Sequence, residues 1–221
     1  MLELKNISKI YNPGLVTEMC LFDGFNFTVN DGEFVSVIGS NGSGKTSMLN
    51  IICGSIPING GEVLINGKSI NKKKDFERYA NIGRVYQNPA MGNCPNMTIL
   101  ENMSLADNKG KPLSGGQRQA VSLLMATLTP IDFLILDEHT AALDPKTAEI
   151  IMELTNKIVT EKKLTAIMVT HNLRYAVEYG SRLIMMDKGH IILDKQGEEK
   201  KSASIDDILE IFNRISIECG N

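Results

Sequence analysis

The chain has 221 residues, of which 43% are hydrophobic and 22% are charged, and its net charge is −3. This composition supplies a substantial core and excludes a disordered chain, and the slight acidity argues against a nucleic-acid partner. No apolar run reaches the length of a membrane span, and residues 1–5 lack the features of a secretion signal. The four cysteines are scattered without a C-x-x-C pair, which indicates reduced thiols. We expect a single cytoplasmic domain over residues 1–221.

The first predicted elements are strands. Apolar and polar residues alternate over residues 2–10 and again over residues 25–29, as they do in half-buried strands. The second run stops at Asn30-Asp31-Gly32, which is a hairpin signal. Residues 61–65 predict another strand, which the Asn66-Gly67 turn closes.

A glycine-rich loop follows the apolar run at residues 34–38 and precedes a helix-compatible stretch at residues 47–53. It reads G-x-x-x-x-G-K-[ST], the phosphate-binding P-loop pattern, and consists of Gly39, Ser40, Asn41, Gly42, Ser43, Gly44, Lys45 and Thr46. Glycines let successive backbone N–H groups turn toward phosphates, and the helix N-terminus that begins near Ser47 adds further donors. We expect Lys45 to reach the β- and γ-phosphates and the Thr46 hydroxyl to hold Mg²⁺.

Strands and helices alternate over the rest of the chain. Apolar runs predict buried strands at residues 82–86, 133–136, 164–169, 182–186 and 190–193. Helical patterns lie at residues 75–80, 98–106, from 117 to about 128, 145–163 and 173–179. This alternation is typical of a parallel sheet covered by helices on both faces.

The C-terminal part carries a polar stretch at residues 198–202, which we interpret as a linker. Ser204 with Asp207 then predicts the start of an amphipathic helix. Its expected apolar face consists of Ile208, Leu209, Ile211, Phe212 and Ile215.

Polar groups follow three of the predicted strands, at the edge where parallel sheets bind ligands. Lys45 comes just after the first, Asp137 and Glu138 end the second, and His171 follows the third. We expect Asp137 to hold Mg²⁺ through water. We expect the Glu138 carboxylate to orient a water molecule or to accept its proton.

Gln87 and Tyr11 are further candidates for the same site because of their positions in the sequence, and His171 can be given a role there. Gln87 ends its strand and can offer a carbonyl to Mg²⁺ and an amide to the attacking water, although a lone glutamine in a loop is usually only solvated. The His171 imidazole could bond the γ-phosphate or the nucleophilic water. Tyr11 could stack on a purine ring.

The stretch Leu113-Ser114-Gly115-Gly116-Gln117-Arg118-Gln119 resembles the signature of ATP-binding-cassette (ABC) ATPases. The order of the other motifs is also similar: an aromatic residue near the N-terminus, the P-loop, Gln87, the signature, the acidic strand end and His171. The resemblance implies a P-loop α/β fold, with a mostly parallel sheet flanked by helices, an N-terminal antiparallel β subdomain and a helical subdomain.

The resemblance also implies the cofactors and the assembly. ATP and Mg²⁺ would be the cofactors, and two copies would enclose two ATP molecules as a homodimer. Ser114, Gly115, Gly116 and the adjoining Gln117 would reach the nucleotide of the other copy. Asp144 would help the two sites to communicate. The chain would then be an ATPase that drives transport.

Residues 136–145, with His139 where a proline is commoner, resemble cassettes of importers of the tryptophan/tyrosine uptake type, as do residues 83–87 and 170–176. The implied partners are an integral-membrane permease and a solute-binding lipoprotein, with the cassette on the inner face of the cell membrane. A cassette of an exporter or lipoprotein-releasing complex is the alternative within the family. A soluble P-loop switch is the alternative outside it. His139 is interpreted as a packing or dimer-edge residue.

One departure from the family concerns the helical subdomain, which we assign to roughly residues 88–128. It is short between Ala106 and Leu113, where family members carry several helices. Either the protein has lost these residues, or the sequence as read omits residues that the protein contains, and we favour the second explanation. An intact mass clearly above 24.3 kDa is the expected result, and a matching mass would exclude this explanation.

Overall fold

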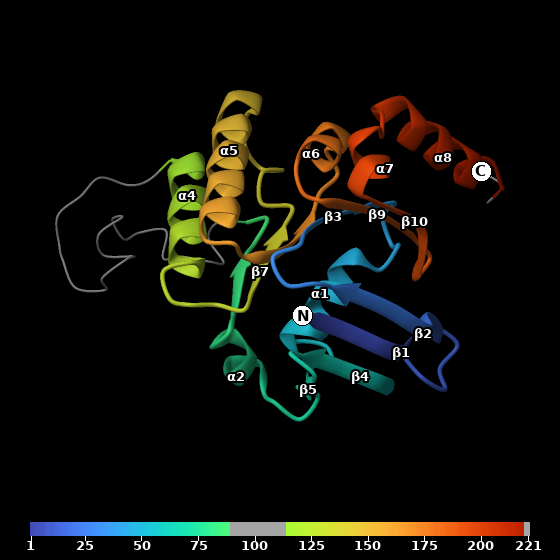
Figure 1. Ribbon diagram of the computed structural model, residues 1–221. Helices are drawn as coiled ribbons and strands as arrows, with labels where there is room; N and C mark the ends of the chain where they lie inside the picture. The colour runs from blue at the N-terminus through green and yellow to red at the C-terminus, as the bar shows by residue number, and fades with distance from the viewer. Residues whose placement is uncertain (89–113, 219–221) are drawn as a thin grey trace.

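The computed structural model describes residues 1–88 and 114–218, whose strands form two sheets (Figure 1). The predicted helix at residues 98–106 and the shortened segment between Ala106 and Leu113 lie outside the described residues.

The first sheet is antiparallel and contains four strands in the order β2-β1-β4-β5. These are β1 (Leu2–Tyr11), β2 (Met19–Val29), β4 (Gly60–Ile65) and β5 (Lys68–Ser69). Leu2 at the start of β1 pairs with Val29 on one side and with Ile65 on the other. The predicted N-terminal antiparallel subdomain is therefore confirmed.

The second sheet contains six strands in the order β10-β9-β3-β8-β7-β6. They are β3 (Phe34–Gly39), β6 (Ile82–Val85), β7 (Phe133–Asp137), β8 (Thr165–Val169), β9 (Arg182–Asp187) and β10 (His190–Gln196). All neighbouring pairs are parallel except β9 with β10. The mostly parallel sheet is confirmed, and β3, β7 and β8 end at one edge.

Helices cover both faces of this sheet (Figure 1). On the side of the N-terminal sheet lie α1 (Lys45–Cys53) and α2 (Asp75–Tyr79). On the other side lie α4 (Gly115–Ala126), α5 (Pro145–Glu161), α6 (Leu173–Glu178), α7 (Gly197–Lys201) and α8 (Ile205–Glu218). Side chains that accept a backbone N–H begin α5 and α6, at Asp144 and Asn172 respectively.

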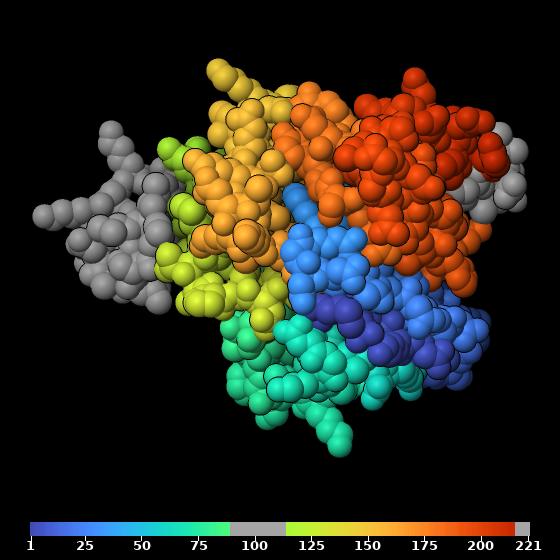
Figure 2. Space-filling view, viewed as in Figure 1, coloured from blue at the N-terminus to red at the C-terminus, as the bar shows by residue number. Residues whose placement is uncertain are grey.

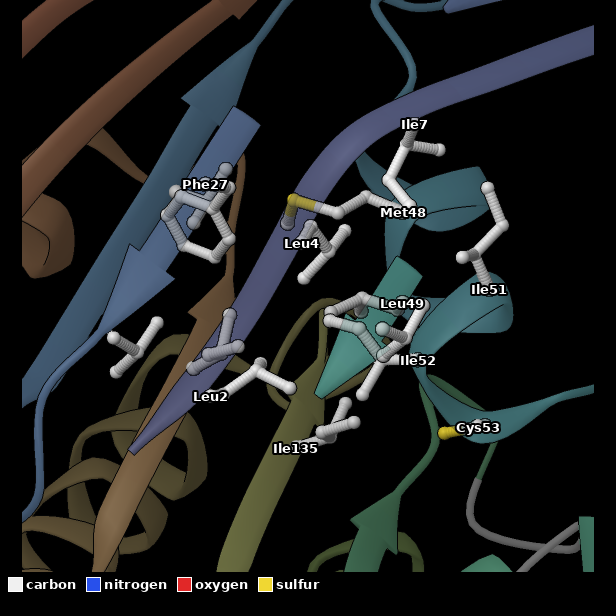
Figure 3. Close-up of a cluster of buried hydrophobic side chains, with 14 of the residues drawn as sticks. Leu2, Leu4, Ile7, Phe27, Met48, Leu49, Ile51, Ile52, Cys53 and Ile135 are labelled. Carbon is white, nitrogen blue, oxygen red and sulfur yellow. The ribbon is translucent and has the colours of Figure 1, made fainter. Parts of the chain in front are cut away.

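Helix α1 lies between the two sheets (Figures 1 and 3). Its buried residues Met48, Leu49 and Ile52 contact Leu4 of β1 and its neighbours in one large hydrophobic core. On the other side this core includes Ile135 of β7. Residues of β7 alternate between faces, so that Phe133 and Ile135 face α1 while Leu134 and Leu136 join the core under α5.

Two local expectations were wrong. Asn30-Asp31-Gly32 makes a turn, with the Glu33 amide bonded to the Asn30 carbonyl, but it leads from β2 in one sheet to β3 in the other and closes no hairpin. Residues 198–202 are mostly helical, within α7, because the Lys200 ammonium bonds the carbonyls of Val177 and Tyr179 and anchors this segment under α6.

The predicted start of the C-terminal helix at Ser204 is confirmed. Ser204 and Asp207 exchange hydrogen bonds at its first turn, both of 3.1 Å. Ile208 is fully buried, with Ile211 and Phe212 packed beside it, whereas Leu209 is 42% exposed and points away from the core. Helix α8 forms the end of the molecule opposite α4 (Figure 2).

Replacing Ile135 by alanine should lower the free energy of unfolding by about 2–5 kcal/mol, because the fully buried side chain supports both α1 and the sheet. Chemical denaturation measures this loss. Ile150→Ala on α5 is the matched control, since Ile150 is 55% exposed. An equal loss in both variants would contradict the assignment of this core.

Candidate nucleotide site

A cavity of about 440 Å³ opens at the carboxyl edge of the parallel sheet. It brings together residues predicted to act in one site, from segments far apart in the chain. Its lining residues are Tyr11, Asn12, Met19, Leu21, Asn41, Gly42, Ser43, Gly44, Lys45, Thr46, Ser47, Glu138 and His171. The volume is in the range of pockets that hold small molecules.

The glycine-rich loop has the backbone that its sequence requires. Gly44 adopts a φ of 104° at the position before α1, which favours glycine. A Cβ at Gly39 would lie 2.2 Å from the carbonyl oxygen of Met186 in β9, so the close approach of these two strands excludes any larger residue.

Lys45 points back into the loop. Its Nζ donates to the carbonyl oxygens of Gly39 and Ser40, both at 2.9 Å, and the side chain is buried. Burial lowers the pKa of Lys45, while the carboxylates of Glu138 and Asp137 act in the opposite direction. An incoming phosphate would offer this ammonium a charged acceptor in place of the carbonyls.

The loop is also held from outside. The Ser40 hydroxyl donates to Asp187 at 2.8 Å, and the Gly189 amide donates to the Ser43 carbonyl at 3.0 Å. Asp187 ends β9 and Gly189 lies in the turn before β10. The sequence did not predict that this turn contacts the site.

Glu138 and His171 both line the cavity and contact each other. The His171 Nε2 lies 2.6 Å from Oε1 of Glu138. Glu138 has a φ of 48°, in the left-handed region, and its amide donates to the carbonyl of Val169. Such a backbone is uncommon for a glutamate and is characteristic of functional sites. The pair can hold a carboxylate in one orientation toward a water molecule.

Tyr11 lies at the other end of the cavity. Its hydroxyl is 3.1 Å from the Ser47 hydroxyl at the start of α1, and the Lys9 ammonium lies 4.8 Å from its ring centre. Asn12, Met19 and Leu21 extend the same wall. These three residues were not predicted. Asn12 follows Tyr11 in the chain, whereas Met19 and Leu21 reach this wall only because β2 pairs with β1.

The signature residues lie apart from this cavity. Ser114 begins α4, where its hydroxyl accepts the Gln117 amide at 3.3 Å and its own amide donates to the Gln117 side chain at 2.9 Å. A Cβ at Gly116 would lie 2.2 Å from Thr147, so α4 packs closely on the start of α5.

Other predicted residues also lie outside the cavity lining, namely Gly39, Ser40, Asp137, Asp144 and Gln87. Asp144 caps α5 by accepting the Thr147 amide. Hydrogen bonds from the Thr147 side chain and, to a smaller extent, from its amide lower the pKa of Asp144. Gln87 follows β6 and is exposed. Within one copy, the described signature residues, Asp144 and Gln87 are therefore not part of the cavity wall.

Asp137 ends β7 and is paired with Arg84 of β6, at 2.7 Å between Nη2 and Oδ2. Sequence reasoning missed Arg84. The sequence did contain a signal for it. Arg84 stands inside the apolar run of β6, and an arginine that is buried in a strand needs a charged or hydrogen-bonding partner.

The residues present suit a magnesium ion. In the described ranges, no group of three or more His, Cys, Asp or Glu side chains could hold a metal by itself. Mg²⁺ in nucleotide sites needs no such cage, because phosphates and waters supply most of its oxygen ligands. The hydroxyl of Thr46 and the carboxylate of Asp137 are oxygen donors on adjoining elements.

The ABC transporter family model matches residues 22–109. The tyrosine transport ATP-binding protein of Clostridioides difficile (strain R20291) is 42% identical, and the match covers 96% of this chain and 98% of that protein. The chain belongs to the ABC transporter family. The phosphonates import ATP-binding protein of Lactococcus lactis subsp. lactis (strain IL1403) is 29% identical over 94% of this chain and 98% of its own length.

Solved structures agree. A dimeric ATP-binding cassette in a post-hydrolysis state with ADP and Pi matches with a TM-score of 0.75 and 31% identity, covering 89% of this chain and 98% of that chain. The ADP conformation of another ATP-binding cassette matches with a TM-score of 0.74 and 26% identity. This match covers 96% of this chain and 98% of that chain. The protein is an ATP-binding and ATP-hydrolysing cassette that uses Mg²⁺. In the described ranges, no helix has the length and hydropathy to span a membrane.

His139, next to Glu138, is buried rather than part of the cavity. Its Nε2 lies 3.0 Å from the Thr155 hydroxyl, which itself donates to the Ile151 carbonyl, so the imidazole donates to Thr155. Burial lowers the pKa of His139 to about 4. This environment agrees with a packing residue.

The His139 environment predicts a pH dependence. The pKa of His139 is about 4 in the folded protein and about 6.5 in the unfolded chain. The neutral, buried His139 therefore contributes fully to the free energy of unfolding above pH 6.5, and this contribution is lost as the pH falls toward 4. The loss should reach about 3 kcal/mol. Urea denaturation of the wild type and of His139→Gln between pH 7 and 4 measures it.

The variant should show a shallower loss than the wild type. His190→Gln is the control, because His190 is exposed, and it should keep the wild-type slope. Equal slopes in His139→Gln and the wild type would refute this assignment.

Proposed function

We propose that the chain powers the import of a small solute such as an amino acid, as the ATPase subunit of an ABC importer. The observation that carries the proposal is the 42% identity, over nearly the full length of both chains, to a protein named for tyrosine transport. Other relatives are named for the import of phosphonates and of spermidine and putrescine. The solute itself does not touch an ATPase subunit, so tyrosine is only one member of the proposed class.

In the proposed mechanism, Glu138 is the catalytic carboxylate. His171 would hold it through the 2.6 Å contact between Nε2 and Oε1, which would orient the carboxylate toward the attacking water. The left-handed backbone at Glu138 turns the side chain out of the line of β7 toward the cavity. Gln87 is proposed to approach the same water and the metal from the loop after β6.

Nucleotide binding is proposed to use the whole loop. Backbone amides of residues 39–46 and the start of α1 would surround the phosphates, with Lys45 supplying the positive charge. Thr46, Asp137 and Gln87 would hold Mg²⁺, which neutralises charge developing on the phosphates. Tyr11 would stack on the base, and Ser47 supports it through the hydrogen bond between their hydroxyls.

A homodimer is proposed to complete each site. Ser114, Gly115 and Gly116 lie outside the cavity of their own copy, at the N-terminus of α4, and helix N-termini can bind anions. Asp144 lies next to them, because α4 packs on the start of α5. The signature residues would reach the γ-phosphate across the dimer, and Asp144 would help the two sites to communicate. A monomer would hydrolyse ATP poorly.

The membrane partners follow from the importer assignment. We propose an integral-membrane permease and a solute-binding lipoprotein, with the chain bound to the inner face of the cell membrane. Neighbouring reading frames that encode a permease and a receptor would support import. A permease without a receptor would favour an exporter or a lipoprotein-releasing complex.

We propose one domain over residues 1–221, with the helical subdomain shortened near residues 106–113. The alignment with the Clostridioides difficile protein supports a shortened chain. It runs over 247 positions, whereas 96% of 221 residues is only about 212. The difference, about 35 positions, is a gap of the size of one or two helices.

Glu138→Gln tests the catalytic assignment. Losing the carboxylate should lower ATP turnover by about 10²- to 10⁴-fold, because the amide cannot accept a proton. ATP affinity should persist, and the variant should elute as a dimer in the presence of ATP. Steady-state phosphate release and size-exclusion chromatography measure both effects.

Glu149→Gln is the matched control, since Glu149 lies on α5 and pairs with Arg174 outside the cavity. It should keep the wild-type rate. Turnover by Glu138→Gln at the wild-type rate would show that the base is elsewhere.

A further inference from the structure

Arg84 is a buried charge in an otherwise apolar strand. It lies in β6, where Ile82 and Val85 are buried, and its own side chain is only 5% exposed. Burying a guanidinium is costly unless its hydrogen bonds are satisfied, and an apolar residue at such a position is often at least as stabilising. The arginine therefore needs an explanation beyond the packing of the strand.

The guanidinium bridges two other elements. Nη2 donates to Oδ2 of Asp137 at 2.7 Å, and Nη1 donates to Oδ1 of Asn50 in α1 at 2.8 Å. The guanidinium carbon also lies 4.6 Å from the ring centre of Tyr86. The third nitrogen, Nε, is buried without a hydrogen-bond partner.

These contacts follow from the alternation of the strands. Arg84 pairs with Ile135 in the register of β6 with β7, and both side chains face α1. Asp137 stands two residues after Ile135 and so faces the same way. Arg84 thereby joins the three segments that supply the proposed metal ligands: α1 with Thr46, the end of β7 with Asp137, and the loop after β6 with Gln87.

We propose that Arg84 is a positioning residue for the magnesium site, where it fixes one oxygen of the Asp137 carboxylate against α1 and so orients the other toward the metal's water shell. Carboxylates that bind metals are themselves held by outer hydrogen bonds, and loss of such a partner typically weakens metal binding 10- to 100-fold. Arg84 fits this role better than lysine would, because its planar fork reaches Asp137 and Asn50 at once.

The experiment measures metal binding separately from turnover. Mn²⁺ is titrated into the full-length protein with ADP, with protein in excess over nucleotide, and free Mn²⁺ is followed by electron paramagnetic resonance. In Arg84→Met the dissociation constant for Mn²⁺ should rise about tenfold. The affinity for a fluorescent ADP analogue in EDTA should stay within about twofold, because Arg84 does not line the nucleotide cavity.

Arg78→Met is the matched control for a merely structural effect. Arg78 is buried to a similar extent and also bonds α1, through the carbonyls of Ile51 and Ile52, but it does not contact Asp137. This variant should bind Mn²⁺ as the wild type does. An equal loss of Mn²⁺ affinity in Arg78→Met and Arg84→Met, or no loss in Arg84→Met, would overturn the proposal.

Two milder variants keep the test decisive if Arg84→Met fails to fold. Arg84→Lys keeps the charge but cannot span both partners, and Asn50→Ala frees only one side of the guanidinium. Both variants should weaken Mn²⁺ binding, but by less than Arg84→Met. Wild-type affinity for Mn²⁺ in both variants would overturn the proposal.

The inference rests on the proposed metal ligands. A wild-type protein whose ADP complex binds Mn²⁺ no better than free ADP does would refute those ligands instead.

Discussion

The burial of α1 between two sheets is the constraint on which the rest of the structure depends. The helix begins at Lys45, directly after the phosphate-binding loop, and its apolar residues complete the cores of both sheets. Any tilt of α1 would disturb close-packed side chains on two sides. The loop at its N-terminus is therefore held rigidly, and further bonds from the β9–β10 turn fix Ser40 and Ser43.

Strand alternation then decides which polar groups reach this helix. In β7 the odd-numbered residues face α1, so Asp137 joins the loop side, whereas Glu138 leaves the strand through a left-handed backbone and turns toward His171. Two adjacent acids thereby receive different environments. Asp137 is neutralised by the buried Arg84, and Glu138 is held at the rim by a histidine that is partly exposed.

Much of the local structure was predictable, because helix caps and apolar periods act over a few residues. The starts of α6 and α8, at Asn172 and Ser204, followed from such caps. The wrong predictions concern segments whose structure is determined by contacts with residues far away in the sequence. The turn at Asn30-Asp31-Gly32 has hairpin chemistry, yet the next strand joins another sheet. Lys200, in a stretch with no apolar pattern, is ordered by carbonyls more than twenty residues away.

The sequence by itself determined the phosphate loop and the polar strand ends, since glycine geometry and strand length are local properties. It could not determine which strands are neighbours. The order β9-β3-β8-β7-β6 brings Lys45, Glu138 and His171 around one cavity. The same order sets Arg84 beside Asp137 and leaves the signature at the start of α4 outside that cavity. Only the tertiary structure decided these relations, because each depends on packing between segments that are remote along the chain.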